Sequence, residues 1–158
     1  MDVQRMIDAL NKSLALEYAA LIQYSQCSFL LQGPEREYLV DFFRDTSKRI
    51  LETHVQRLGG KIVALGGLPT VEPATIHQAA DFKEMLRQAL ELEREAQKAH
   101  HGALKLLGEK DEAPAETALR HMLQEMVEDE QREIDALELL LATKQLGAIA
   151  KEVRLKSG

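Results

Sequence analysis

The chain has 158 residues, of which 45% are hydrophobic and only 4% aromatic, with 9 Gly and 4 Pro. This length fits one domain with a sizeable core, and the composition favours a helical bundle over a β-sandwich or barrel. The net charge of −6 and the lack of a long basic run argue against nucleic acid as a partner. The single cysteine, Cys27, excludes an intramolecular disulfide framework and any four-cysteine iron or zinc module.

The first residues, Met1 to Arg5, open directly into an amphipathic pattern rather than into a basic segment followed by an apolar run. We therefore expect no signal peptide and a cytoplasmic protein. No stretch of about 20 apolar residues occurs, so we expect no membrane span and no membrane partner.

Two long amphipathic helices are predicted in the first half of the chain. The first covers roughly residues 3–31 and ends at the Gly-Pro pair 33–34, which breaks a helix. The second covers roughly residues 35–65 and ends at the Gly-Gly pair 66–67. Residues 66–80 contain two prolines and few long apolar runs, which predicts a long crossover connection.

Two further helices are predicted in the second half, over roughly residues 81–108 and 115–145, and a short acidic turn joins them. The segment 148–155 is predicted to form either a short fifth helix or a frayed tail. Because short connections join the first helix to the second and the third to the fourth, the helices of each pair should be antiparallel. The crossover is long enough to run back along the bundle. The sequence thus predicts an all-α, antiparallel four-helix bundle with one long crossover, in a single domain over residues 1–158.

Each predicted helix carries one acid or histidine near the middle of its apolar face. These residues are Glu17, His54, Glu93 and Glu130. At about 100° per residue, each shares a face with the leucines that precede and follow it. A carboxylate on a core face is costly unless a cation meets it, and no Lys or Arg occupies these core positions. Because antiparallel packing would bring mid-helix residues to one height, the pattern predicts a metal site.

A dinuclear carboxylate site in a helical bundle takes one Glu from each of two helices and a Glu-x-x-His from each of the other two. Glu17 and Glu93 supply the two single glutamates. His54 lies on an apolar face that we predict to include Leu51, and this leucine stands where the motif has its Glu. In the fourth helix, Glu133 stands where the motif has its His.

One segment in each predicted helix matches the pattern of a known family. The segments are Leu16-Glu17-Tyr18-Ala19 with Gln23-Tyr24, Thr53-His54 with Leu65-Gly66-Gly67-Leu68-Pro69, Leu90-Glu91-Leu92-Glu93, and Glu130-Gln131-Arg132-Glu133-Ile134-Asp135-Ala136-Leu137-Glu138. In this order and at matching intervals, they resemble the bacterioferritin branch of the ferritin-like family over nearly the whole chain. The resemblance implies the ferritin-like bundle and an iron site in its core.

Carried over position by position, the resemblance implies metal ligation by Glu17, His54, Glu93 and Glu130. Leu51 stands where the family has a metal-bridging Glu, and the loss of this carboxylate argues against a tightly coupled two-iron site. Glu133 stands where the family has a second His. Glu133 offers an oxygen ligand suited to Fe, Mn or Mg. Alternatively, Glu133 lies at the side of the helix and points into solvent. Glu52 stands where this branch has its haem-binding Met, so we expect no haem.

Three polar residues near the predicted site receive other assignments. His100 shares a face with Glu93 but lies two turns, about 10 Å, along the helix, so we predict a hydrogen-bonded core role. Tyr24 is predicted to pack in the core, with a redox or hydrogen-bonding role as the alternative. Asp129 is assigned to a solvated acidic face.

The first hypothesis is a ferritin-like protein that binds one or two iron ions, or manganese, and oxidises ferrous iron for storage or detoxification. Its partners would be metal ions and O₂ or peroxide, in a homo-oligomer that is a dimer or a larger shell. One metal would lie at Glu17, His54 and Glu130, and a second at Glu93, Glu130 and Glu133. Leu51 and Glu133 would weaken this ferroxidase-type activity.

Two other functions stay open at this point. One is a non-storage redox enzyme of the same fold, such as a rubrerythrin-like peroxidase or an oxygenase. The other is a structural or interaction bundle that has lost its metal chemistry, for which Leu51 is the best indication.

Overall fold

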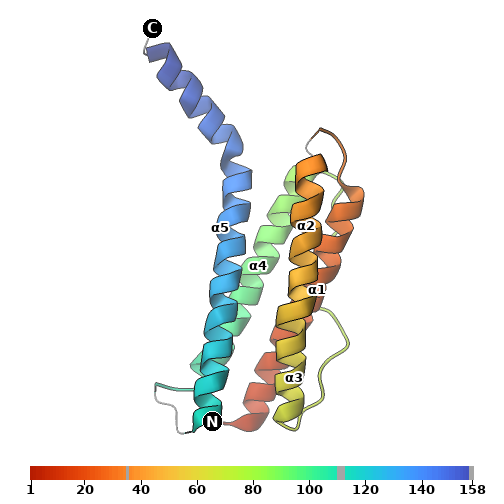
Figure 1. Ribbon diagram of the computed structural model, residues 1–158, viewed down its shortest axis with the longest axis vertical. Helices are drawn as coiled ribbons and strands as arrows, with labels where there is room; N and C mark the ends of the chain where they lie inside the picture. The colour runs from red at the N-terminus through yellow and green to blue at the C-terminus, as the bar shows by residue number, and fades with distance from the viewer. Residues whose placement is uncertain (35, 110–112, 157–158) are drawn as a thin grey trace.

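The computed structural model describes residues 1–34, 36–109 and 113–156, with side chains described as far as residue 142. It forms a bundle of long helices with one extended connection (Figure 1). The elements are α1 (Val3–Leu30), α2 (Arg36–Ile50), a π-helical turn η1 (Leu51–Val55), α3 (Gln56–Ala64), α4 (Phe82–Lys105) and α5 (Pro114–Lys156). The predicted all-α four-helix bundle is confirmed, with α2, η1 and α3 together forming the predicted second helix.

The last helix is longer than the sequence suggested. We expected residues 148–155 to form a separate fifth helix or a frayed tail, but α5 continues through this segment to Lys156. Gly147 is the one residue between 143 and 150 that disfavours a helix strongly. A single glycine costs about 1 kcal/mol relative to alanine, which is too little to end a helix of this length.

Aspartates cap two of the helices at their N-termini. Asp2 Oδ1 accepts a hydrogen bond from the Arg5 N–H of α1 at 3.1 Å. Asp81 Oδ1 does the same for the Glu84 N–H of α4 at 3.0 Å. Each cap satisfies a backbone donor that has no partner within its helix, so the short polar side chains fix where α1 and α4 begin.

Glycine ends α3 and starts the crossover. Gly66 adopts a φ of 84°, a left-handed conformation that glycine reaches without steric cost. The Gly66 N–H then donates to Val63 O and the Gly67 N–H to Ile62 O, both at 2.9 Å. These bonds satisfy the last carbonyls of the helix and turn the chain out of the bundle.

The crossover runs along α1 and is fastened to it by hydrogen bonds. Asn11 holds it twice, because Nδ2 donates to Leu68 O at 3.1 Å and Oδ1 accepts from the Thr70 N–H at 2.8 Å. Further along, the His77 N–H donates to Gln23 Oε1 at 3.1 Å. The predicted long connection is therefore an ordered, extended loop that is hydrogen-bonded to α1 and leads from α3 to the start of α4.

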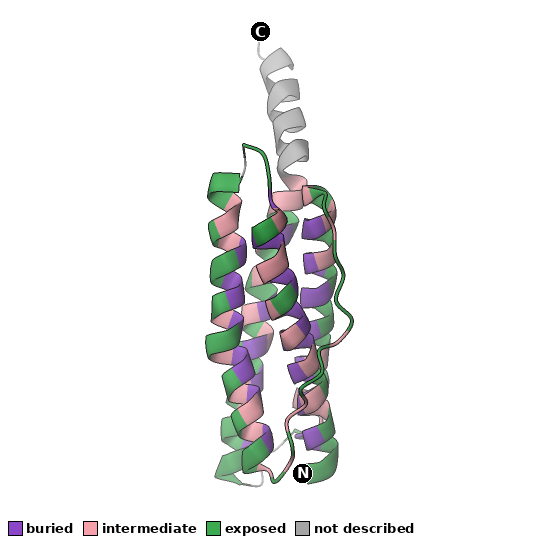
Figure 2. Cartoon of the chain, turned by 90° about the vertical axis from the view of Figure 1, so that its right-hand side faces the viewer, coloured by how far each residue is buried: buried purple, intermediate pink, exposed green. Residues whose placement is uncertain are grey.

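The buried parts of the helices, purple in Figure 2, face the inside of the bundle, and their apolar side chains form one core. Its most deeply buried side chains include Tyr24, Phe43, Met6, Leu10, Leu14, Leu58, Ile62, Met85, Leu86, Leu119 and Leu123. Removing this much apolar surface from water is the main force that holds the helices together. None of the helices, over the residues that the structure describes, has the length and apolar character needed to cross a membrane.

The π turn η1 changes which residues face the core. Ile50 and His54 are 3% and 1% exposed, whereas Leu51 is 43% exposed. The predicted core position of Leu51 is therefore wrong. A π turn contains more residues than an α turn, so it rotates the helix face relative to a regular α-helix. Within this turn, the Thr53 hydroxyl donates a hydrogen bond to Arg49 O at 2.6 Å. This bond gives the Arg49 carbonyl a partner at the point where the α-helical hydrogen-bond pattern changes to the π-helical one.

Candidate metal centre

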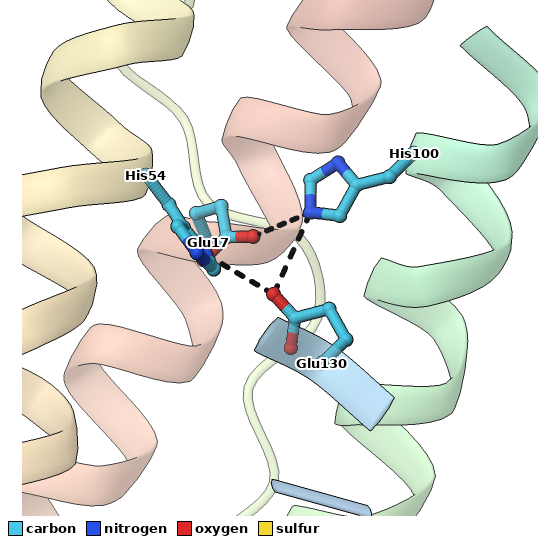
Figure 3. A group of neighbouring side chains, drawn as sticks. All are labelled: Glu17, His54, His100 and Glu130. Carbon is cyan, nitrogen blue, oxygen red and sulfur yellow. Dashed lines mark hydrogen bonds and ion pairs between the residues drawn. The ribbon is translucent and has the colours of Figure 1, made fainter. Parts of the chain in front are cut away.

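Four side chains from four segments of the bundle converge in the core. They are Glu17 of α1, His54 of η1, His100 of α4 and Glu130 of α5 (Figure 3). None is more than 2% exposed. One donor atom from each residue lies within 4.8 Å of the donor atoms of the other three. We call these four residues the core cluster.

The donor atoms of the core cluster have the spacing of metal ligands. His54 Nδ1 lies 3.2 Å from Glu17 Oε2 and 3.1 Å from Glu130 Oε1. His100 Nε2 lies 2.8 Å from Glu17 Oε1 and 3.6 Å from Glu130 Oε1. Nitrogen and oxygen ligands that each lie about 2.0–2.2 Å from one ion are about 2.8–3.6 Å apart at tetrahedral or right angles. The four residues therefore fit a metal ion.

His54 presents an unpaired nitrogen to the two carboxylates. Its Nδ1 is buried and has no hydrogen-bond partner among the described residues, despite its closeness to two carboxylate oxygens. Its Nε2 lies 3.1 Å from Asp129 Oδ2. A carboxylate on the far nitrogen fixes the ring of a metal-binding histidine and makes it a better ligand. Asp129 therefore orients His54 with Nδ1 toward the core cluster.

The assignment of Asp129 to a solvated acidic face is therefore wrong. Its side chain is 20% exposed and pairs with His54 on its inner side and with Arg132 on its outer side. Helical periodicity does not reveal this contact, because Asp129 directly precedes Glu130 on α5 and adjacent residues of a helix point about 100° apart. The contact depends on how close α5 lies to η1.

The two histidines carry the positive charge that balances the carboxylates when no metal is bound. Burial by itself would lower the pKa of both imidazoles, but contacts with Glu130 and Glu17 outweigh it. The pKa of His54 rises to about 10 and that of His100 to about 9. Burial would likewise raise the pKa of Glu130, but its contacts with Glu93 and with the two imidazoles lower it well below its usual value.

His100 takes the fourth position in the core cluster, and its predicted hydrogen-bonded core role is confirmed. Its distance from Glu93 along α4 predicts only that these two residues do not share one metal. It does hydrogen-bond to Glu17, at 2.8 Å, and it also brings a donor nitrogen to the cluster. The residue that it faces across the bundle, not its distance from Glu93, decides its role.

Glu93 is buried but lies outside the core cluster. It is 2% exposed and stands seven residues before His100, which is about 10 Å along α4. Glu93 and Glu130 are close enough to affect each other's pKa, but Glu93 is not one of the four residues whose donor atoms come together in the core cluster. Burial, and then the charge of Glu130, raise the pKa of Glu93 well above its usual value.

Glu133 is neither a solvated residue nor a member of the core cluster. Its side chain is 16% exposed, and Oε1 lies 2.5 Å from Arg49 Nη2. Burial raises the pKa of this carboxyl, and the nearby guanidinium partly offsets that rise. The sequence did not reveal this ion pair, because its partners lie 84 positions apart.

Comparison with known proteins agrees with the fold. A family model described as a ferritin-like domain matches residues 7–146. A "Nutrient stress-induced DNA-binding protein" of Synechococcus sp. is 28% identical over 126 residues, which cover 76% of this chain and 71% of that protein.

A solved structure gives a longer match. It is described as "ferritin like, diiron-carboxylate proteins from Bacillus anthracis str. Ames" and is 33% identical, with a TM-score of 0.82 over 89% of this chain and 98% of the other. The family match spans all members of the core cluster. On these findings, this chain belongs to the ferritin-like family.

Proposed function

We propose that this protein binds iron at Glu17, His54, His100 and Glu130 and oxidises ferrous iron with O₂ or peroxide. The observation that carries the proposal is a buried pair of imidazoles and a buried pair of carboxylates at ligand spacing. Imidazole nitrogen suits iron, and carboxylate oxygen suits manganese, so manganese is the alternative ion. Each ferrous ion would supply one electron, so two ferrous ions would be oxidised for each O₂ reduced to peroxide or each peroxide reduced to water.

The chain's own residues would prepare the site in two ways. Glu17 and Glu130 carry the two negative charges that balance a divalent ion, so the buried site stays neutral. His54 and His100 would each have to release a proton to act as ligands, because both are protonated at neutral pH without metal. Asp129 would hold the His54 ring in the binding orientation during this exchange.

The exposed position of Leu51 weakens the reading that this bundle has lost its metal chemistry. That reading rested on an apolar residue where the family has a bridging carboxylate. Because Leu51 is 43% exposed, it takes no place in the core cluster. His100 supplies the fourth donor from the facing helix instead.

We propose a homo-oligomer as the working form, which is common among ferritin-like proteins. Ile22 and Phe29 lie seven residues apart on one face of α1 and are 44% and 71% exposed, which supports a contact surface there.

We propose no nucleic-acid partner, although one relative is named as a DNA-binding protein, because the chain carries a net charge of −6. Membership of the bacterioferritin branch and the lack of haem also stay predictions.

The test is metal binding and oxygen consumption by protein purified without added metal. Natural chain given ferrous iron should bind it and consume O₂, and Glu17→Gln with Glu130→Gln should do neither while still folding by circular dichroism. Natural chain that binds no iron, or a double variant that matches it, would overturn the proposal. Retention of ferric product by the protein would distinguish storage from turnover as a peroxidase or an oxygenase.

A further inference from the structure

The geometry points to a role for Arg49 in setting how many metal ions the bundle holds. We propose that its guanidinium is a built-in cation that occupies the Glu133 carboxylate, so that the chain binds one metal ion tightly and a second only when Arg49 withdraws. The inference rests on the proposed function, because it takes the core cluster as the first metal position.

Arg49 reaches from the surface of α2 to a carboxylate next to the core cluster. Its Nη2 lies 2.5 Å from Glu133 Oε1, and the side chains are 34% and 16% exposed. Glu133 lies one helical turn from Glu130 on α5, so the two carboxylates are neighbours on the helix surface. The guanidinium therefore stands one turn along the bundle from the proposed first metal.

Buried oxygen atoms without partners lie on the inner side of this ion pair. Glu133 Oε2, Glu93 Oε1 and the Tyr24 hydroxyl are buried and have no hydrogen-bond partner among the described residues. Burial raises the pKa of Tyr24 well above its usual value, and the charges of Glu93 and Glu133 raise it further. Unpaired buried oxygen is unfavourable, and it is what an oxygen-ligated cation requires.

The second cation would use Glu133, its helical neighbour Glu130 and the unpaired oxygen of Glu93. Among the described residues only the core cluster has its donor atoms already gathered at ligand spacing, which is consistent with Arg49 holding the Glu133 carboxylate. A guanidinium stays charged at any physiological pH and pairs well with carboxylates. An incoming metal would have to break the Arg49–Glu133 pair before it could use Glu133. Because the Arg49 side chain is 34% exposed, its guanidinium can move away from Glu133 into solvent.

The chain contains a matched control for Arg49. Arg57 of α3 pairs with Glu125 of α5, so it also joins the second predicted helix to the last one. None of the described unpaired buried oxygens belongs to that pair. Replacing Arg57 removes a similar interhelical ion pair without uncovering a carboxylate beside the core cluster.

The test is manganous ion titration of natural chain, Arg49→Gln, Arg57→Gln and Arg49→Gln with Glu133→Gln, by calorimetry and electron paramagnetic resonance. We expect one tight equivalent for natural chain and Arg57→Gln, and two for Arg49→Gln, with spectra of coupled ions. The double variant should return to one. Loss of one charge-assisted hydrogen bond corresponds to about ten- to a hundredfold in binding constant, so the second equivalent should tighten by that factor in Arg49→Gln.

The outcomes separate this inference from the proposed function. One equivalent in both natural chain and Arg49→Gln, or two tight equivalents in natural chain, would overturn the role of Arg49 and leave the core cluster intact. No binding by natural chain would overturn the proposed function itself. Melting by circular dichroism shows whether each variant is folded before it is titrated.

Discussion

His100 Nε2 lies 2.8 Å from Glu17 Oε1, although the two residues are 83 positions apart and come from different helices. This contact joins α1 to α4 at the level where η1 and α5 bring His54 and Glu130. It replaces the predicted meeting of Glu17 with Glu93. The proposed site contains two histidines and two glutamates because α1 and α4 are aligned so that His100 lies beside Glu17.

Replacing His100 should weaken metal binding, whereas replacing its neighbour should not. His100 is fully buried in the core cluster, and His101 is exposed. Residues that only orient a ligand cost about 10- to 100-fold in metal affinity when they are changed, so we expect His100→Ala to cost about 100-fold or more. Manganous ion titration of His100→Ala and His101→Ala measures the difference. Equal affinities in the two variants would exclude His100 as a ligand.

Asp129 should contribute to affinity without touching the metal. Asp129→Asn keeps an oxygen near His54 Nε2 but removes the negative charge that orients the imidazole, so we expect a loss of about 10- to 100-fold. Glu128→Gln is the control, because Glu128 is the exposed neighbour and loses the same charge. The same titration checks both variants. If Glu128→Gln weakened binding as much as Asp129→Asn, the effect would be one of overall charge.

Restoring the family's carboxylate at position 51 should not restore its chemistry. The sequence suggested that Leu51 limits iron oxidation, but the π turn leaves this side chain 43% exposed. A carboxylate there would face solvent, so Leu51→Glu should oxidise ferrous iron at the rate of the natural chain. Oxygen consumption after addition of ferrous iron measures this. A faster variant would mean that the segment 51–55 adopts a different helical register when metal is bound.

Stability of the metal-free protein should fall at alkaline pH. His54 and His100 have a pKa near 6.5 when unfolded and about 10 and 9 when folded. A raised folded pKa stabilises the protein fully below pH 6.5, and this contribution is lost as pH rises through 9 to 10. Thermal melting from pH 6 to 10, without metal, should therefore show a declining midpoint.

A double histidine variant provides the control for this pH dependence. His54→Gln with His100→Gln removes both titrating groups, so its midpoint should vary less between pH 6 and 10 even if the variant is less stable at every pH. An equally steep decline in this variant would assign the effect to other groups. Metal binding should also release protons near neutral pH, which calorimetry in buffers of different ionisation enthalpy detects.

The sequence by itself determined the helices and the direction in which their polar residues point. The 3.6-residue period, the glycine and proline breaks and the long connection predicted the bundle and its crossover. The same period showed that Glu17, His54, Glu93 and Glu130 face inward, and all four are at most 2% exposed. These features depend on local chain geometry and on the burial of apolar faces, which a single sequence records.

Only the tertiary structure decided which inward-facing residues meet. Helical periodicity fixes the angle of a side chain around its helix but not its height relative to a neighbouring helix, and two turns amount to about 10 Å. That height placed His100 rather than Glu93 beside Glu17, and it brought Arg49 to Glu133. The π turn changed the face on which Leu51 lies. Contacts between distant segments come from the packing of whole helices, so no local pattern of residues specifies them.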